Sequence, residues 1–234
     1  MCQWSRAGLE MNMDKDVHDG DHELNKELDS PGKRYGARLQ QRSLASILQQ
    51  QVINQEKLSL SHALDRVRED GSAILVASAI VAARRRFVVG SGKSLAYASL
   101  LSRDLLGGLS QVFLVDGTAV RAIDILSETK STDVLVVFSF RRYRRDTITI
   151  AEKFAAAGGD VVLITDDATS PINEIASASI VVETDSVSYT DSPTSIAAIC
   201  HLLATLCTAS AKGARRRLAE QDRLSAEFDL YLNH

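Results

Sequence analysis

The sequence predicts an α/β fold in which a doubly wound, five-stranded parallel sheet is flanked by helices, with a helical or disordered N-terminal extension. Three observations carry this prediction. Short apolar runs alternate with helical segments from about residue 86 onward. Residues 134–139 form an unbroken apolar run of the kind found in the middle of a parallel sheet. Polar loops follow three of the apolar runs, as expected where parallel strands end.

The apolar runs give the strands and the intervening periodic segments give the helices. The fifth strand is short, and we expect it near an edge of the sheet. Glycine pairs end two of the helices, and Pro193 stands in the first turn of a long one. The predicted strands are 86–90, 111–115, 134–139, 161–165 and 180–182, and the predicted helices are 72–84, 95–106, 147–157, 193–212 and 214–231.

The segment before the first strand divides in two. Residues 1–36 are rich in aspartate and glutamate, are broken by Pro31 and Gly32, and read as disordered. Residues 37–70 carry apolar side chains at three- and four-residue steps and read as helical. The predicted organisation is therefore a disordered terminus at 1–36, a helical arm at 37–70, and one domain at 71–234.

Composition excludes several classes of protein. The 234 residues carry a net charge of −3 with a pI near 6.0, which does not point to nucleic acid or to an anionic membrane. The longest apolar run, 73–83, is too short to span a bilayer, and residues 1–16 contain no secretory signal. Cys200 and Cys207 stand seven residues apart, which puts them on one helix face as small apolar residues. We expect a cytoplasmic protein without a metal or cofactor.

The loop after the first strand is the best candidate for a ligand site. A strand, a turn of small residues and a helix start together hold an anion, because glycines let the backbone approach and the helix N-terminus offers N–H groups. Ser91 and Ser94 add hydroxyl groups around Gly92, and either is suited to cap the helix. Phe87 and Leu95 stand where a Walker loop and a dinucleotide fingerprint need glycine, so neither motif is present. The alternative is a tight turn without a ligand.

A second loop is rich in arginine. Four arginines fall within residues 141–145, directly before a helix, and guanidinium groups clamp phosphates bidentately. The alternative is a solvated basic turn whose charges pair with an aspartate. Two further loops contain residues suited to cap a helix. Asp167 or Thr169 is suited to cap a short helix that opens at Pro171, and Ser192 is suited to cap the long helix that follows it.

Few residues suggest catalysis. His201 lies within a predicted helix and is expected to be packed or partly buried. Glu152 and Glu183 are isolated carboxylates without an evident partner. These three are weak candidates for a catalytic base.

The residues from about Leu58 to the C-terminus resemble the sugar isomerase (SIS) domain, in particular the effector domain of RpiR-type (MurR/RpiR) transcriptional regulators. The resemblance rests on the order and spacing of several motifs and on the final helix, and it covers about three quarters of the chain. The motifs are residues 90–94, 139–147, 164–166, 170–171 and 189–192, and the final helix is residues 217–231.

The resemblance implies a homo-oligomeric, dimeric or tetrameric, phosphosugar-binding domain. Carried over, the hydroxyl groups of Ser91, Ser94 and Ser139 contact the sugar phosphate, Thr147 stands at the start of the next helix, and Ser192 lies near the sugar. One departure stands out. Arginines occupy the Ser, Gly and Ser/Thr positions of the phosphate loop that many such domains carry after the third strand, and an arginine there either donates to phosphate or fills the pocket. These are Arg141, Arg142 and Arg144.

Three hypotheses follow. The first is a sugar-phosphate sensor, the SIS domain of a regulator. The second is a phosphosugar isomerase that uses Glu152, Glu183 or His201 as its base. The third is an interaction module whose arginine loop serves as a docking patch. RpiR-type regulators carry an N-terminal helix-turn-helix domain, but only about 55 residues precede the resemblance here. DNA binding is therefore expected from the family rather than from the residues.

Overall fold

The computed structural model describes residues 30–39 and 45–232 and divides them into two compact units. The smaller unit comprises the described residues up to Leu58 together with Asp185–Ser192. The larger unit comprises Ser59–Thr184 and the described residues from Pro193 onward. Helix α3 (Ala45–Asp70) contributes residues to both units.

The smaller unit is built from helix α2 (Pro31–Leu39), the first part of α3 and an irregular segment. Arg34 forms an ion pair with Asp191, and the Ser192 hydroxyl donates a hydrogen bond of 2.5 Å to Glu56. Helix α2 corrects the prediction of disorder for residues 31–36: proline suits the first helical position, so Pro31 begins a helix here instead of breaking one. The remainder of the predicted disordered terminus, residues 1–29, lies outside the described residues.

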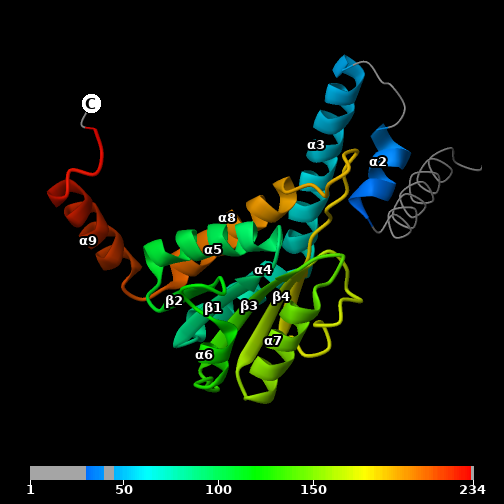
Figure 1. Ribbon diagram of the computed structural model, residues 1–234. Coiled ribbons are helices and arrows are strands. Elements are labelled where there is room, and N and C mark those ends of the chain that lie inside the picture. Colours follow the sequence, from blue (N-terminus) through cyan, green and yellow to red (C-terminus); the bar gives the residue numbers. More distant parts are fainter. Residues whose placement is uncertain (1–29, 40–44, 233–234) are drawn as a thin grey trace, which may run out of the picture. The chain divides into compact units, whose positions relative to one another are not determined.

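The larger unit contains the predicted five-stranded parallel sheet, in the order β2-β1-β3-β4-β5 (Figure 1). All seven residues of β3 are buried, as expected of a central strand. The fifth strand lies at an edge, which confirms the sequence-based prediction. The strands are β1 (Arg85–Gly90), β2 (Val112–Val115), β3 (Asp133–Ser139), β4 (Asp160–Thr165) and β5 (Ala178–Val181).

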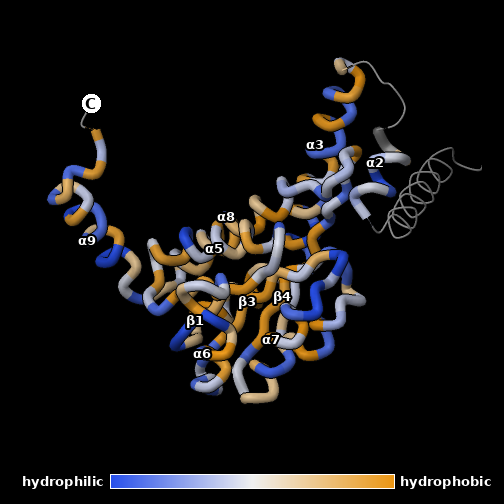
Figure 2. Tube along the Cα trace, in the orientation of Figure 1, coloured by the Kyte–Doolittle hydropathy of each residue, from blue (hydrophilic) through white to orange (hydrophobic). Residues whose placement is uncertain are grey.

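Helices cover both faces of the sheet, so the fold is doubly wound. Side chains alternate across a strand, and those of β3 enter two separate cores: Val136 packs on one face and Val137 on the other. Figure 2 shows the apolar strands of the sheet, with β3 and β4 largely in orange. Helices α4 (Ser72–Ala82), α5 (Ser94–Gly108) and α8 (Thr194–Ser210) line the first core, and α6 (Ala122–Leu126) and α7 (Arg145–Ala156) line the second.

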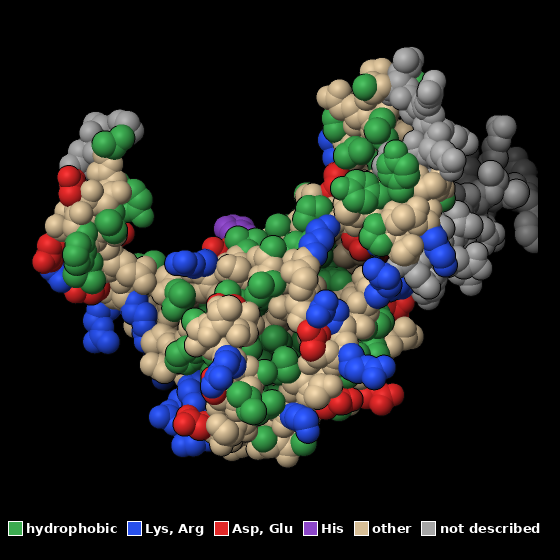
Figure 3. Space-filling model, in the orientation of Figure 1, with side chains coloured by type: hydrophobic (Ala, Val, Ile, Leu, Met, Phe, Trp, Pro, Cys, Tyr) green, Lys and Arg blue, Asp and Glu red, His purple; other side chains and the backbone are tan. Residues whose placement is uncertain are grey.

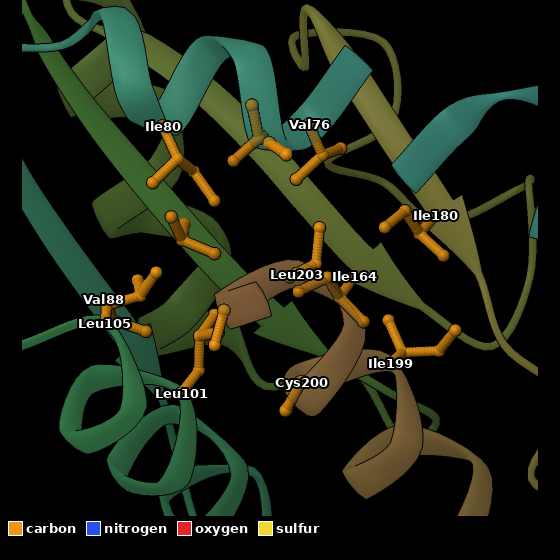
Figure 4. Packing of buried hydrophobic residues seen from close by; sticks show 14 of the residues in the cluster. Val76, Ile80, Val88, Leu101, Leu105, Ile164, Ile180, Ile199, Cys200 and Leu203 are labelled. Carbon is orange, nitrogen blue, oxygen red and sulfur yellow. The ribbon is translucent and has the colours of Figure 1, made fainter. Parts of the chain in front are cut away.

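The first core is the larger of the two (Figure 4). Ile80 of α4, Leu101 of α5 and Ile199 of α8 are fully buried, and each contributes about 1.5–3 kcal/mol by leaving water. Cys200 and Cys207 also lie on the buried face of α8, as predicted, and burial raises the pKa of each thiol to about 12. Helix α9 (Ala214–Glu227) follows α8, and its Gln221 donates a hydrogen bond to the Leu106 carbonyl of α5.

Two local features differ from the sequence-based prediction. Helix α6 was not predicted, because its five residues are too few to show a period. No helix opens at Pro171, where residues 171–175 form turns. Asp167 accepts hydrogen bonds from the backbone N–H and the hydroxyl of Thr169 in a local turn, rather than capping a helix.

Within the described ranges, no single helix has both the length and the apolar composition needed to cross a membrane. Helices α8 and α9 meet those requirements only as a pair, and the pair is bent by 107°.

Candidate functional site

The candidate site lies at the carboxyl ends of β1 and β3. These strands are neighbours at the point where the strand order reverses, since β2 lies on one side of β1 and β3, β4 and β5 lie on the other. Gly90, the last residue of β1, stands opposite Phe138 of β3. Open α/β sheets bind ligands at such a reversal because the loops after the two strands diverge there.

Two glycines shape the loop after β1. A Cβ atom at Gly90 would lie 2.6 Å from the carbonyl oxygen of Ser94, so only glycine lets the first turn of α5 come this close to the strand. Gly92 has φ of +63°, a conformation that glycine adopts without strain. The N-cap of α5 is Lys93, with no side-chain cap, so the prediction that Ser91 or Ser94 caps this helix is wrong.

Ser91 and Thr147 meet across the site. The Thr147 hydroxyl donates a hydrogen bond of 3.1 Å to the Ser91 hydroxyl, and the Ser91 hydroxyl lies 3.3 Å from the Asp146 carboxylate. Thr147 is buried, and its backbone N–H also contacts Asp146, at 2.8 Å. Arg144 completes the group with an ion pair to Asp146 at 2.8 Å. Three donor groups from three residues, the Ser91 hydroxyl, the Thr147 N–H and the Arg144 guanidinium, therefore surround one carboxylate.

The electrostatics of the group favour an anion at this position. The hydrogen bond from Arg144 lowers the pKa of Asp146, although burial opposes the shift, and the Thr147 N–H and Ser91 add to the effect. The hydrogen bond and ion pair with Asp146 also raise the pKa of Arg144. Asp146 also stands in the first turn of α7, where the helix dipole favours negative charge.

Ser139 ends β3 with a buried hydroxyl group. The residue is 3% exposed, and its Oγ atom has no hydrogen-bond partner among the residues that the structure describes. A buried hydroxyl group without a partner costs free energy, so its presence calls for an explanation. It stands opposite Thr165, the last residue of β4.

The arginines after β3 differ in their surroundings. Arg141 points to the loop after β4: its guanidinium group lies 3.6 Å from the Asp166 carboxylate and 3.5 Å from that of Asp167. Burial is the main reason why the pKa of Asp166 is raised and that of Tyr143 rises to about 12. Arg142 is exposed. Of the three predicted arginines, the structure brings Arg144 to Ser91 and Thr147 through Asp146.

Ser192 belongs to the smaller unit, where it bonds to Glu56. The N-cap of α8 is Pro193, with no side-chain cap, so the prediction that Ser192 caps this helix is wrong.

The weak catalytic candidates are dispersed. Glu152 is exposed on α7. His201 is exposed on α8, so the expectation that it is packed or partly buried is wrong. Glu183 is not isolated, because its carboxylate lies 3.4 Å from Nδ1 of His62 on α3. Among the described residues, no group of His, Cys, Asp or Glu is arranged to hold a metal ion.

Sequence reasoning did not name Asp146 or His62 as site residues, although the alternative that the arginine loop pairs with an aspartate is seen in the Arg144–Asp146 pair. The signal for Asp146 was present, since an aspartate two residues after Arg144 at a helix start suits both the arginine and the helix dipole. No sequence signal links His62 to Glu183, which is 121 residues away. In the structure, the Ser91–Thr147 group holds the Asp146 carboxylate with a hydroxyl group, a backbone N–H and a guanidinium group.

Comparisons with known proteins agree with this fold. The profile of the SIS domain family matches residues 79–206. The sugar isomerase domain of an RpiR transcription factor from Sphaerobacter thermophilus is 26% identical, with a TM-score of 0.69 over 75% of this chain and 98% of that one. No curated protein sequence matches the chain significantly.

Two further solved structures share the fold at lower identity. The Vibrio vulnificus NanR protein in complex with ManNAc-6P is 14% identical, with a TM-score of 0.67 over 86% of this chain and 75% of that one. A phosphoheptose isomerase from Francisella tularensis is 12% identical, with a TM-score of 0.59 over 72% of this chain and 100% of that one.

Proposed function

Because this chain belongs to the SIS domain family, a family of phosphosugar-binding domains, we propose that it senses a sugar phosphate as the effector domain of an RpiR-type transcriptional regulator. The observation that carries the proposal is the convergence of donors from Ser91, Thr147 and Arg144 on the Asp146 carboxylate. A carboxylate and a phosphate accept the same hydrogen bonds, so the group is suited to the phosphate of a ligand. The similarity to an RpiR sugar isomerase domain supports the regulatory role.

Ligand binding requires an exchange of anions. The phosphate takes the hydrogen bonds of Ser91, Thr147 and Arg144, and the Asp146 side chain turns away, which it is free to do because it is 48% exposed. Ser139 offers a further hydroxyl group at the end of the next strand. Ser94, at the start of α5, and Gly92 shape the same loop. Arg141 and Arg142, from the loop that also carries Arg144, and Ser192 are further proposed contacts to the ligand.

The catalytic candidates support sensing over turnover. Proton abstraction needs a base within hydrogen-bond reach of the substrate carbon, directly or through one water. Glu152 lies on the exposed surface of α7, and His201 lies exposed on α8, outside the Ser91–Thr147 group.

The proposed protein is cytoplasmic and homo-oligomeric, a dimer or tetramer.

The test is a thermal-shift panel of hexose and pentose phosphates. ManNAc-6P, the ligand in the NanR complex, heads the panel, and unphosphorylated ManNAc is its matched control. A ligand at 100 times its dissociation constant stabilises the protein by about 2.7 kcal/mol. Stabilisation by one phosphorylated sugar, and none by its unphosphorylated partner, is expected. Equal midpoints with every sugar phosphate at millimolar concentration would contradict the proposal.

A phosphosugar isomerase is the second candidate, and the His62–Glu183 pair favours it. A carboxylate 3.4 Å from an imidazole is a common acid–base arrangement. Incubation with each sugar phosphate of the panel, followed by separation of aldose and ketose forms, tests this candidate. Conversion lost in Glu183→Gln and kept in Glu152→Gln would establish it, and no conversion at all would leave the sensor.

DNA binding separates a conventional regulator from an interaction module. Binding that depends on phosphate contacts weakens steeply with salt. Retardation of the gene's own upstream region, lost with rising salt, is expected of a regulator. A salt-independent response or no retardation would rule out a conventional repressor. Affinity for sugar phosphate that persists when Arg144 is replaced would favour the interaction module.

A further inference from the structure

A second cluster of cationic groups surrounds a cavity of about 290 Å³ at the opposite end of β1 from the candidate site. The cavity lies where the end of α4, the turn before β2 and the junction of α8 with α9 meet. None of its lining residues, all within the described ranges, is Asp or Glu. The polar lining residues are Arg86, Ser110, Ser210, Lys212 and Arg217.

Arg86 forms one wall of the cavity and is 6% exposed. Its Nε donates to the Ile80 carbonyl at 2.7 Å, and Nη2 donates to the Val81 carbonyl at 2.9 Å. Its Nη1 contacts the carbonyls of Ser110 at 3.0 Å and Arg84 at 3.4 Å. A guanidinium group has five N–H donors, so one N–H of Nη2 remains beyond these bonds. No ion pair to Arg86 is present among the described residues, and a buried charge of this kind is costly without a counter-charge.

Two more cations face the same space. Arg217 of α9 donates to the Ser110 hydroxyl at 3.0 Å and contacts the Lys212 carbonyl at 3.5 Å, which leaves further N–H groups on its guanidinium. Burial, followed by repulsion from Arg217, lowers the pKa of Arg86. The side chain of Lys212 is exposed, and its ammonium group makes no hydrogen bond or ion pair with any residue in the described part of the chain. Figure 3 shows Lys and Arg side chains below the start of α9, on the left of the view.

We propose that this cavity binds the phosphate group of a small phosphorylated molecule, held by Arg86, Lys212 and Arg217. The anion supplies the counter-charge that the lining lacks, and the hydroxyl groups of Ser110 and Ser210 offer further hydrogen bonds. A volume of 290 Å³ is at the lower end of the range for ligand pockets and admits a phosphate ester. Because Arg217 belongs to α9 and Arg86 to β1, the bound anion joins that helix to the sheet.

Isothermal titration calorimetry with inorganic phosphate and with glucose 6-phosphate tests the proposal. The background is the Ser91→Ala/Thr147→Val protein, which removes the hydroxyl groups of the site after β1. The test variant adds Lys212→Gln and Arg217→Gln. The matched control instead adds Arg215→Gln and Arg216→Gln, exposed residues of the same segment that do not line the cavity, so the change in net charge is identical.

We expect the affinity for phosphate to fall about tenfold or more in the test variant and to stay within about twofold in the control, since two charge-assisted donors are lost only in the former. Tighter binding of glucose 6-phosphate than of inorganic phosphate identifies the ester as the ligand, and the reverse order identifies the free ion. Equal weakening in both variants, or no binding by the background protein at tens of millimolar phosphate, would overturn the proposal. Far-UV circular dichroism verifies that all variants are folded.

Discussion

The hydroxyl groups of Ser91 and Thr147 lie 3.1 Å apart, although 56 residues separate them in the chain. One follows β1, and the other stands in the first turn of the helix after β3. They meet because β1 and β3 are neighbours in the sheet, so the segments that follow their carboxyl ends start from one place. Both hydroxyl groups contact the Asp146 carboxylate, which marks where an anion is held.

The proposed function predicts that removing these hydroxyl groups weakens ligand binding. We expect Ser91→Ala and Thr147→Val each to reduce affinity for the sugar phosphate identified in the panel by about fivefold to tenfold, the effect of one hydrogen bond to a charged group. Calorimetric titration measures the effect. Thr149→Val is the matched control, because Thr149 is exposed on the same helix. Unchanged affinity in both site variants would place the phosphate elsewhere.

The side chains of Asp146 and Arg144 act in opposite directions on affinity. Asp146→Asn removes the carboxylate that occupies the anion position, so we expect tighter binding of the sugar phosphate. Arg144→Gln removes a charge-assisted donor, so we expect binding about tenfold weaker. Arg145→Gln, the exposed neighbour, controls for net charge. Weaker binding in Asp146→Asn would show that the carboxylate positions the ligand instead of competing with it.

Ser139→Ala separates stability from binding. The buried Ser139 hydroxyl has no partner within the described residues, so its removal is expected to stabilise the ligand-free protein by about 1 kcal/mol in urea denaturation. If the hydroxyl contacts ligand, the same variant binds sugar phosphate more weakly. A loss of stability in the absence of ligand would indicate that an ordered water or another group already satisfies the hydroxyl.

Gly90, the last residue of β1, and Gly107, near the end of α5, predict opposite effects of alanine. Gly90→Ala places a Cβ atom 2.6 Å from the backbone oxygen of Ser94, so we expect a loss of about 1–3 kcal/mol of stability. Gly107→Ala places its Cβ atom 3.5 Å from a methyl group of Leu218, an ordinary contact. Because Gly107 lies within a helix, alanine there is expected to stabilise by about 0.5–1 kcal/mol. Chemical denaturation compares the two, and equal effects would contradict the close approach at Gly90.

The Arg85–Asp133 pair predicts how stability depends on pH. The Asp133 side chain is fully buried and accepts hydrogen bonds from Arg85 at 2.6 Å and from the Lys130 N–H at 2.9 Å. Burial opposes its ionisation, but these bonds outweigh burial and lower its pKa. A carboxyl whose pKa is lower in the folded than in the unfolded state stabilises the fold above pH of about 4, and this stabilisation is lost as pH falls through the folded-state value.

Asp133→Asn removes the buried carboxylate that pairs with Arg85 and leaves only the exposed Glu128, at 3.5 Å, so we expect a loss of about 3 kcal/mol at pH 7. The difference between the two proteins should narrow as pH falls from 5 to 3, as measured by urea denaturation. Asp124→Asn, at an exposed ion pair with Arg121, is the control and should change the unfolding midpoint little. A difference that stays constant down to pH 3 would contradict the assignment.

The local pattern of apolar and polar residues was sufficient to predict most of the fold. The apolar runs predicted all five strands, with β3 in the interior and β5 at an edge, because a buried parallel strand has an apolar side chain at nearly every position. Caps were predicted poorly. Whether Ser94 or Ser192 caps a helix depends on the backbone angles of the residue at the N-cap. In the structure, neither serine side chain caps α5 or α8.

The sequence by itself determined the class of fold and the two loops that bear the candidate site, since both follow from the order of apolar and polar residues along the chain. Only the tertiary structure decided which side chains meet. It placed Asp146 against Ser91, turned Arg141 toward Asp166, and brought Arg217 beside Arg86. The physical reason is that hydrogen bonds and charge pairs act over a few ångströms, and the distances between residues far apart in the chain are set by how the strands order and the helices pack.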